Sequence, residues 1–395
     1  MAFATIGTKG IEDAAIATAD IADNAVTSAK TSGIPARPNA QPLIINGDMG
    51  VWQRSTSTVT MSDGYYNVDR YRGENNVASS AATWSRSTSV PDDTGLAYSL
   101  QVDCTTADAS IAASEQCGIQ QTIEAQDLQL LKWGTSDAEA LTVAFWCKSN
   151  QTGQHSVSLR KLDNTNYCQP KTYTISSANT WEKKVLTFSA LTLSGGAIAN
   201  DNGDGLQIHW KLSAGSNYQG TADTWTATNQ GATAVSGDVN FLSSTSNNFF
   251  LTGVQIEVGS YTAATIPPFQ NETYANNLMR CQRYYYFHVS ETENGGTDTT
   301  ISLTSQYNSS SMKGFISFPT RMRTKPTLKQ NTGSNMYRVY ENGSNATMTS
   351  LTLSTETTYN TAVFTAGSTV SVTAGSCGTL QTMDGTAFVA FDSEL

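Results

Sequence analysis

The sequence predicts an all-β protein, and three observations support that prediction. Short runs of alternating apolar and polar residues recur along most of the chain, with the period of two expected for strands that have one wet face. Turn residues separate these runs, as at 93–95 and 201–205. Charged residues make up only 14% of the chain, well below the roughly 25% of an average soluble domain, and uncharged polar residues take their place.

The first predicted element is a fibrous stalk over residues 1–32. Small apolar residues recur there at intervals of five, at Ile6, Ile11, Ile16, Ile21 and Val26. Five residues of an α-helix turn through about 500°, so these side chains cannot form one stripe on a single helix. Equivalent chains wound together would instead bring one such residue per repeat to a shared axis. We therefore expect an oligomerisation segment that needs partners to be ordered, with a flexible tail as the alternative.

A linker is predicted at 33–42, where three prolines in ten residues disfavour both helix and sheet. Residues 43–270 then predict an antiparallel jelly-roll β-sandwich, because eight or more strands in about 230 residues suit a double sheet. The expected strands include 140–148, 155–161, 171–175, 181–188 and 206–212.

The last two predicted elements are a connector at 271–286 and a smaller β-sandwich at 287–395. Within the connector we expect a short helix from Glu272 to Tyr286, capped by Asn271. The β pattern then restarts, and the expected strands include 301–304, 314–319, 351–354, 362–365 and 388–391.

Charge and hydropathy exclude several classes of protein. A net charge of -10 argues against nucleic-acid binding, which needs Lys and Arg to displace counterions from phosphates. The largest basic cluster is Arg321–Lys325. A run of about 18 apolar residues is missing, so no membrane insertion is expected. The first residues lack the basic and apolar regions of a secretory signal, so release by cell lysis is expected instead.

The six cysteines predict free, buried thiols. They are widely spaced and form no C-x-x-C pair, so neither a zinc site nor a dense disulfide scaffold is indicated. Free thiols agree with folding in a reducing cytoplasm.

The sequence predicts no catalytic residue and no cofactor. Only His155, His209 and His288 could act as an imidazole base, and two of them lie in predicted strands. The usual hydrolase, phosphate-loop and dinucleotide motifs are missing. The Asp and Glu residues could always supply a pair for glycoside hydrolysis, but no acidic cluster lies in an apolar setting that would raise one pKa. The turn at 201–205 lacks the spacing of a calcium loop.

Aromatic residues offer one candidate binding site. Glycan sites place flat side chains against the apolar faces of sugars, among amides and carboxylates that bind hydroxyls. Tyr218 and Trp225 lie in a polar, loop-like stretch with little reason to be core, so they are the predicted glycan-binding residues, with packing under a loop as the alternative. Four other tryptophans alternate within predicted strands and are therefore expected in the core. They are Trp52, Trp146, Trp181 and Trp210.

Four phrases of the sequence resemble bacteriophage tail fibre and related virion fibre proteins. Leu43–Arg54 (LIINGDMGVWQR) and Phe249–Gly259 (FFLTGVQIEVG) resemble the opening and closing strands of one module, and each is expected to be a strand. Tyr274–Tyr286 resembles the connector that follows that module, and Phe318–Thr327 resembles another phrase of phage tail proteins. Carbohydrate-binding modules share the expected jelly-roll architecture, and the sequence resembles them loosely.

The resemblance implies a structural and adhesive role. It predicts a homotrimeric tail fibre, made in the host cytoplasm and located on the virion, that contacts phage tail or capsid proteins through its N-terminus and binds host surface glycans. A head fibre or capsid decoration protein with the same module is one alternative, and a capsule-degrading tailspike is another. A secreted bacterial glycan-binding module is disfavoured by the missing signal and by the five-residue repeat.

The jelly-roll expectation also bears on metal binding. Such modules often hold a structural Ca²⁺ between the first and last strands, where Asn46, Asp48 and Glu257 would be the candidates. The same residues suit hydrogen bonding in a turn equally well, so no metal is predicted.

Overall fold

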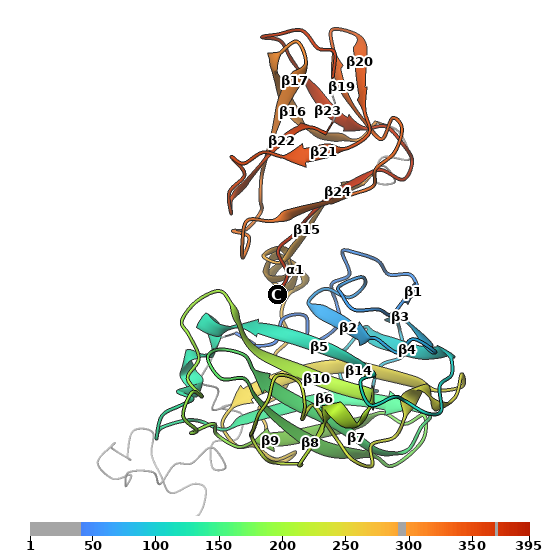
Figure 1. Ribbon diagram of the computed structural model, residues 1–395, viewed down its shortest axis with the longest axis vertical. Helices are drawn as coiled ribbons and strands as arrows, with labels where there is room; N and C mark the ends of the chain where they lie inside the picture. Colours follow the sequence, from blue (N-terminus) through green and yellow to red (C-terminus); the bar gives the residue numbers. More distant parts are fainter. Residues whose placement is uncertain (1–40, 291–297, 368–369) are drawn as a thin grey trace, which may run out of the picture.

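The structure, a computed structural model, describes residues 41–290, 298–367 and 370–395. Figure 1 shows two bodies, a larger one built from β1 to β14 and a smaller one built from β15 to β24, with the helix α1 between them. The predicted oligomerisation residues Ile6, Ile11, Ile16, Ile21 and Val26 lie outside the described residues, so the trimeric stalk stays a prediction.

The larger body consists of two six-stranded antiparallel sheets. The first sheet has the order β1 (Val59–Thr60), β3 (Ala81–Ser87), β4 (Ser99–Thr106), β14 (Asn248–Val258), β6 (Leu141–Ser149) and β9 (Glu182–Phe188). The second sheet has the order β12 (Thr226–Ala227), β8 (Tyr167–Ile175), β7 (Gly153–Lys161), β10 (Asp204–Ala214), β5 (Gln116–Glu124) and β2 (Tyr71–Asn75). A short parallel pair joins β11 (Gln219–Gly220) and β13 (Ala234–Val235), and the 3-10 helices are Ala125–Leu131, Ser216–Tyr218 and Phe241–Ser243.

Side chains of alternate residues fill the space between the two sheets. In β10, Leu206, Ile208 and Trp210 are fully buried, while the residues between them point to the other face. The Trp210 ring meets Phe145 of β6 edge to face, with centroids 5.8 Å apart. Each period-two strand expected between 140 and 212 is present, so the predicted jelly-roll sandwich is confirmed.

The smaller body repeats this arrangement around a core of its own. A three-stranded sheet with the order β15 (Tyr285–Ser290), β24 (Phe388–Asp392) and β18 (Thr327–Gln330) packs on a seven-stranded one. The order in the latter is β20 (Ser344–Met348), β19 (Tyr337–Glu341), β23 (Cys377–Thr382), β16 (Thr300–Asn308), β17 (Ser311–Ser317), β22 (Thr361–Ala366) and β21 (Leu351–Leu353). The Phe391 ring lies 4.9 Å from that of Phe318 and 5.7 Å from that of Phe364. The predicted all-β class with a smaller C-terminal sandwich is confirmed.

The prediction of a strand at Leu43–Arg54 is wrong. Asn46 and Met49 have φ values of 61° and 55°, which reverse the chain. The Asn46 side chain holds the turn by donating to the carbonyls of Val51 and Asp69 and by accepting from the Val51 amide at 2.9 Å. The segment still contacts the strand that resembles a closing strand, because the Val254 amide of β14 donates to the Gly47 carbonyl at 2.8 Å.

The helix of the connector is shorter than predicted. The structure has α1 at Tyr274–Gln282, and its N-cap is Thr273, whose hydroxyl accepts from the Asn276 amide. The predicted cap at Asn271 and the predicted end at Tyr286 are therefore wrong. Tyr285 and Tyr286 lie in β15 instead. Their backbone groups pair with β24, and a helix that continued to Tyr286 would break this pairing.

The cysteines are free thiols, as the sequence predicts. All six cysteines are described and unpaired, and five of them are buried, the exception being the exposed Cys377. Across the described ranges, no helix has the length and apolar character needed to cross a membrane.

Candidate functional site

The candidate site lies on the outward face of the first sheet, over Trp146 of β6. The side chain of Trp146 is half-buried, unlike its inward-pointing neighbours Phe145 and Cys147, which are fully buried. Its strand partners are Thr252 of β14 and Lys183 of β9. The prediction that Trp146 belongs to the core is wrong, because alternation along β6 places it on the opposite face.

Gly253 in β14 leaves room for the Trp146 ring because it has no side chain. Gly253 has a φ of 59° and lies where the register between β14 and β6 shifts. A Cβ atom there would lie 2.9 Å from Trp146 Cδ1 and 3.1 Å from a methyl carbon of Leu96. Only glycine combines this backbone conformation with so close an approach of the two side chains.

These groups line a pocket of about 200 Å³. Its lining residues are Thr94, Leu96, Trp146, Lys183, Gly253, Gln255 and Phe269. The lining thus combines an indole and a phenyl ring with an ammonium, a hydroxyl and an amide. That combination suits a ligand with one apolar face and several hydroxyl groups.

Gln255 supplies a hydrogen-bond acceptor whose capacity is unused. Its side chain is 4% exposed, and its Nε2 donates to the Pro267 carbonyl at 3.0 Å and to Glu257 Oε1 at 3.2 Å. Its Oε1 is buried without a partner. Burying such an oxygen unpaired costs about 1–3 kcal/mol, so a donor from a ligand would be favourable there.

Lys183 adds a positive charge at the rim. Burial lowers the pKa of its ammonium, since loss of water disfavours the charged form. A ligand hydroxyl could recover part of that lost solvation by accepting a hydrogen bond.

More aromatic side chains lie on the same outward face. The Trp181 ring meets Phe250 of β14 with centroids 6.1 Å apart, and the Lys148 ammonium lies 4.1 Å from the Phe250 centroid. Trp181 is also half-buried, so its predicted place in the core is wrong, whereas Trp52 and Trp210 are buried as predicted. Period-two alternation revealed these strands but could not tell which face of each strand turns inward.

The structure does not place the two predicted glycan-binding residues in one cluster. The Tyr218 hydroxyl donates to the Ser114 carbonyl at 3.1 Å, and the Lys211 ammonium lies 5.7 Å from its ring. The Trp225 indole donates to the Ser189 carbonyl at 2.9 Å, and its ring contacts Trp133 edge to face at 5.2 Å. Both residues are half-buried, and their role in binding stays a prediction.

The outward face of the second sheet carries a buried charge network. Lys211 of β10 donates to Glu74 of β2 at 2.6 Å, and His209 lies 3.2 Å from the same carboxylate. Burial opposes the charge of Glu74, yet Lys211 and His209 hold the pKa of this carboxyl well below its usual range. The chain around β13 covers part of this face, where the Val235 amide donates to Ser156 Oγ. The network therefore links β2 to β10.

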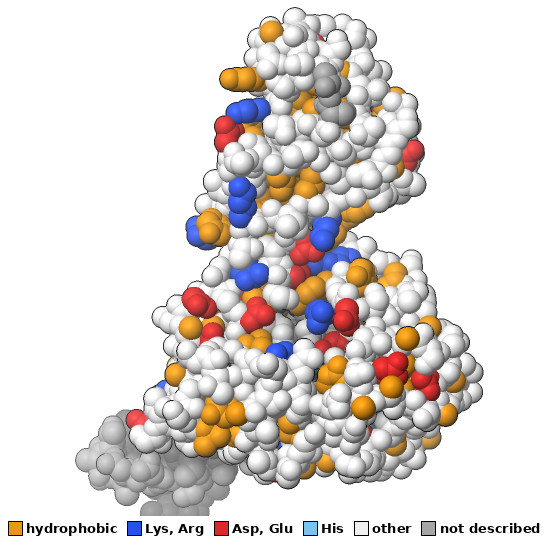
Figure 2. All heavy atoms as spheres, in the orientation of Figure 1, with side chains coloured by type: hydrophobic (Ala, Val, Ile, Leu, Met, Phe, Trp, Pro, Cys, Tyr) orange, Lys and Arg blue, Asp and Glu red, His pale blue; other side chains and the backbone are white. Residues whose placement is uncertain are grey.

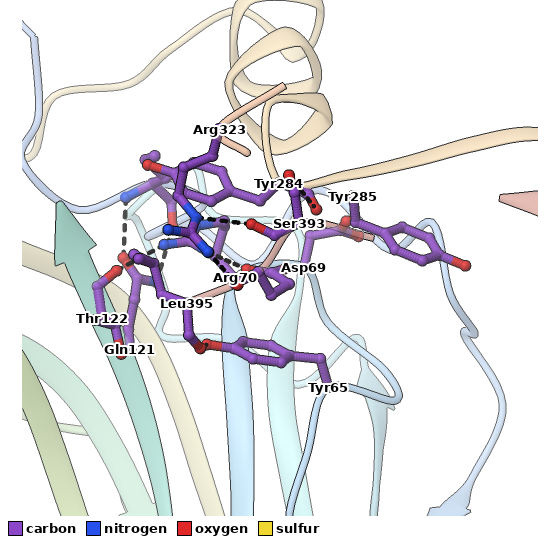
Figure 3. Close-up of polar contacts among 12 residues, drawn as sticks. Tyr65, Asp69, Arg70, Gln121, Thr122, Tyr284, Tyr285, Arg323, Ser393 and Leu395 are labelled. Atoms are coloured by element: carbon purple, nitrogen blue, oxygen red, sulfur yellow. Dashed lines mark hydrogen bonds and ion pairs between the residues drawn. The ribbon is translucent and has the colours of Figure 1, made fainter. Parts of the chain in front are cut away.

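A second polar cluster joins the two bodies, and Figure 3 shows it from close range. Arg70 pairs with Glu394, donates to the Thr122 carbonyl at 2.6 Å and lies 3.4 Å from the Tyr284 ring centroid. The Tyr65 hydroxyl donates to the Leu395 carbonyl at 2.8 Å. These contacts fix residues 393–395 of the smaller body against the larger one.

The structure also locates the candidates for calcium binding. Asn46 is engaged in the turn described above, and Asp48 accepts from Asn277 Nδ2 at 2.9 Å. Glu257 accepts from Gln255. Among the described residues, no group of three or more His, Cys, Asp or Glu side chains is arranged to hold a metal ion.

No protein-family model and no curated protein matches this chain. Solved structures similar to it include a xylan-binding domain from CBM 22, with 11% identity, 57% of this chain and 99% of that chain covered, and a TM-score of 0.29. A family 11 carbohydrate-binding module of a Clostridium thermocellum cellulase has 10% identity, covers 52% and 96%, and scores 0.26. A CBM4 structure has 14% identity, covers 54% and 97%, and scores 0.26. Likenesses this weak carry no inference about what this chain binds.

Proposed function

We propose that this chain is a non-catalytic glycan-binding protein and that the pocket over Trp146 is its binding site. The observation that carries the proposal is the joint presence of a half-exposed indole, an unpaired buried amide oxygen and a lysine in one pocket of about 200 Å³. A sugar ring would lie against Trp146, and one of its hydroxyls would donate to Gln255 Oε1.

Substitution of Trp146 tests the pocket. Trp146→Ala removes the aromatic surface, so we expect at least a tenfold loss of affinity for host surface polysaccharide, measured by isothermal titration calorimetry. Tyr218→Ala and Trp225→Ala are the matched aromatic controls, and each should retain binding if the pocket is the site.

Two further measurements keep this test decisive. The melting temperature of Trp146→Ala shows whether the sandwich remains folded. Loss of binding in the Tyr218 or Trp225 variant, with Trp146→Ala unaffected, would instead favour the residues predicted from sequence. New reducing ends in the polysaccharide would contradict the non-catalytic assignment.

We further propose that the protein is a virion component, most simply a homotrimeric tail fibre attached through its N-terminal segment. The five-residue repeat between Ile6 and Val26 and the phrases shared with phage fibre proteins support this proposal. In a trimer, one bound site would hold the other two sites close to the host surface. Their effective concentration at that surface would rise, so three weak glycan contacts would together give firm attachment.

Sedimentation velocity tests the proposed assembly. We expect the full chain to sediment as a trimer and a version lacking residues 1–40 to sediment as a monomer, because the repeat would supply the shared apolar axis. A monomeric full chain, or a truncated chain that remains trimeric, would contradict this role for the repeat.

A further inference from the structure

The basic cluster at Arg321–Lys325 places two guanidinium groups beside the junction of the two bodies. Met322 is fully buried in the core of the smaller body. Its neighbours Arg321 and Arg323 both line a cavity of about 320 Å³, which contains residues of both bodies. Figure 2 shows Lys and Arg side chains, with acidic ones beside them, at the narrow waist where the bodies meet.

The cavity has a distinctive set of lining residues. We call it the waist groove, and it is lined by Gln126, Asp201, Asn202, Arg283, Arg321, Arg323 and Tyr359. Three arginines and one aspartate therefore line this space in a chain whose net charge is -10. Phe and Trp are missing from the lining, so the groove suits a polar ligand.

Two of the three arginines are held by the protein itself. Arg323 donates to the carbonyls of Asn202, Ser393 and Glu394 at 2.7–2.9 Å. Arg283 donates twice to the Glu124 carboxylate, at 2.7 Å each, which raises its pKa. These two residues fix the walls of the groove.

Arg321 differs from both because, within residues 41–290, 298–367 and 370–395, its guanidinium neither donates a hydrogen bond to the protein nor forms an ion pair. Its side chain is exposed, and its guanidinium lies 4.6 Å from the centroid of the Tyr359 ring. The backbone holds this pair together, since the amide of Met322 donates to the Tyr359 carbonyl at 2.9 Å. Stacking on an aromatic ring orients a guanidinium while its N–H edges stay available for a planar anion.

The other lining groups narrow the class of ligand. Asp201 is exposed and would repel a multiply charged polyphosphate more strongly than a single carboxylate, and it can accept hydrogen bonds from hydroxyl groups. Gln126 and Asn202 line the same space, and their amide nitrogens donate to Glu124 at 2.6 Å and to the Arg323 carbonyl at 2.7 Å. A ligand that satisfies all of these groups combines a carboxylate with several neighbouring hydroxyls.

We propose that the waist groove binds an acidic saccharide whose carboxylate pairs with Arg321. The carboxylate would accept two parallel hydrogen bonds from the guanidinium. Asp201 and Asn202 would bind the hydroxyls of the same sugar, and Tyr359 acts as a positioning residue for Arg321. This proposal extends the proposed glycan-binding function, but the waist groove shares no lining residue with the pocket over Trp146.

Calorimetric titration of the full chain with acidic trisaccharides tests the proposal. The probes are trisaccharides of galacturonate and glucuronate and a sialic-acid-terminated trisaccharide, each compared with its carboxyl-reduced counterpart. We expect at least one acidic probe to bind at least tenfold more tightly than its reduced form. Arg321→Gln should weaken that binding at least tenfold and abolish the preference for the acid.

Matched variants separate a specific site from general attraction. Lys325→Gln removes the same charge four residues away, at an exposed side chain outside the groove, and should leave the affinity unchanged. Tyr359→Ala should weaken binding less than Arg321→Gln does. Tyr359→Phe keeps the aromatic ring, so this variant should bind as tightly as the parent chain. Trp146→Ala should have no effect, which distinguishes this site from the pocket on the first sheet.

Several results would overturn the proposal. They are the absence of binding by every acidic probe, equal binding of acidic and reduced forms, and equal losses in Arg321→Gln and Lys325→Gln. Because Arg321 is exposed, its variant should keep the melting temperature of the parent chain.

Discussion

His155 is a titratable residue whose side chain is buried inside the larger body. It is 2% exposed, both ring nitrogens lack a hydrogen-bond partner, and its ring stacks on Tyr173 with centroids 5.5 Å apart. Burial lowers its pKa; the backbone of Gln151 and the carboxylate of Asp238 oppose that shift only in part, and Lys184 adds to it. His155 thus serves as a neutral aromatic side chain of the core.

This burial predicts a loss of stability in mild acid. The folded-state pKa of His155 lies below the unfolded value of 6.5, so its contribution to stability is present above pH 6.5 and is lost as the pH falls. Each unit of difference between the two pKa values corresponds to about 1.4 kcal/mol. We expect the free energy of unfolding, measured by urea denaturation, to fall between pH 7.5 and 5.5.

His155→Phe is the control for that prediction. Phenylalanine keeps the ring stack but cannot bind a proton, so the variant should lose less stability than the parent over the same pH range. Equal pH dependence in both proteins would assign the effect to other groups, of which the buried His209 is the first to consider, since burial lowers its pKa as well.

At the scale of elements, α1 is anchored by one buried amide. Asn277 is 3% exposed, and its Oδ1 accepts from the backbone amide of Asn46 at 3.1 Å. Its Nδ2 donates to Asp48 Oδ1 at 2.9 Å. The helix thereby satisfies polar groups of the turn that replaces the predicted opening strand.

Asn277→Ala should therefore destabilise the protein by about 1–3 kcal/mol, because it leaves the Asn46 amide unpaired in a buried position. Chemical denaturation measures the loss. Asn276→Ala, at an exposed position of the same helix, should change stability by less than about 0.5 kcal/mol. A similar loss in both variants would mean that helix propensity, rather than the buried hydrogen bonds, sets the effect.

The strands of the larger body could be predicted from sequence, whereas the turn at Leu43–Arg54 could not. β7 and β10 were predictable because apolar and polar side chains alternate along each strand, although the structure buries most residues on both faces of these strands. The segment Leu43–Arg54 has the apolar residues of a strand, but Asn46 and Met49 reverse it, and its burial depends on β14, about 200 residues away.

The candidate site was less predictable than the fold, for the same reason. Trp146 was visible as an aromatic residue in a strand, but its face depends on how β6, β9 and β14 are paired. Gly253 gave a weak signal, because an isolated glycine in a strand pattern suggests a bulge or a close approach. The waist groove joins Asp201, Arg283 and Arg321 from three distant segments, which no local pattern could bring together.

At the scale of the whole molecule, the two bodies are joined by buried charges. The side chain of Arg70 is 1% exposed and that of Glu394 is 4% exposed. Arg54 adds a second contact to Glu394 at 3.1 Å and lies 3.6 Å from Asp69. Burial raises the pKa of Asp69 to about 6, although Arg54 favours its charged form. The junction thus holds two arginines that share Glu394, and Arg54 also lies near Asp69 and Asp392.

Glu394→Gln should uncouple the two bodies. The substitution keeps the shape of the side chain but leaves Arg70 and Arg54 without their shared counter-ion, and breaking a buried pair in this way costs about 3–5 kcal/mol. We expect a lower melting temperature in scanning calorimetry, with the transitions of the larger and smaller bodies further apart. Glu356→Gln removes an exposed pair with Lys313, so it should cost less than about 1 kcal/mol. If Glu394→Gln cost no more than Glu356→Gln, the bodies would be held together by their apolar and backbone contacts, and the buried charges would contribute only to their orientation.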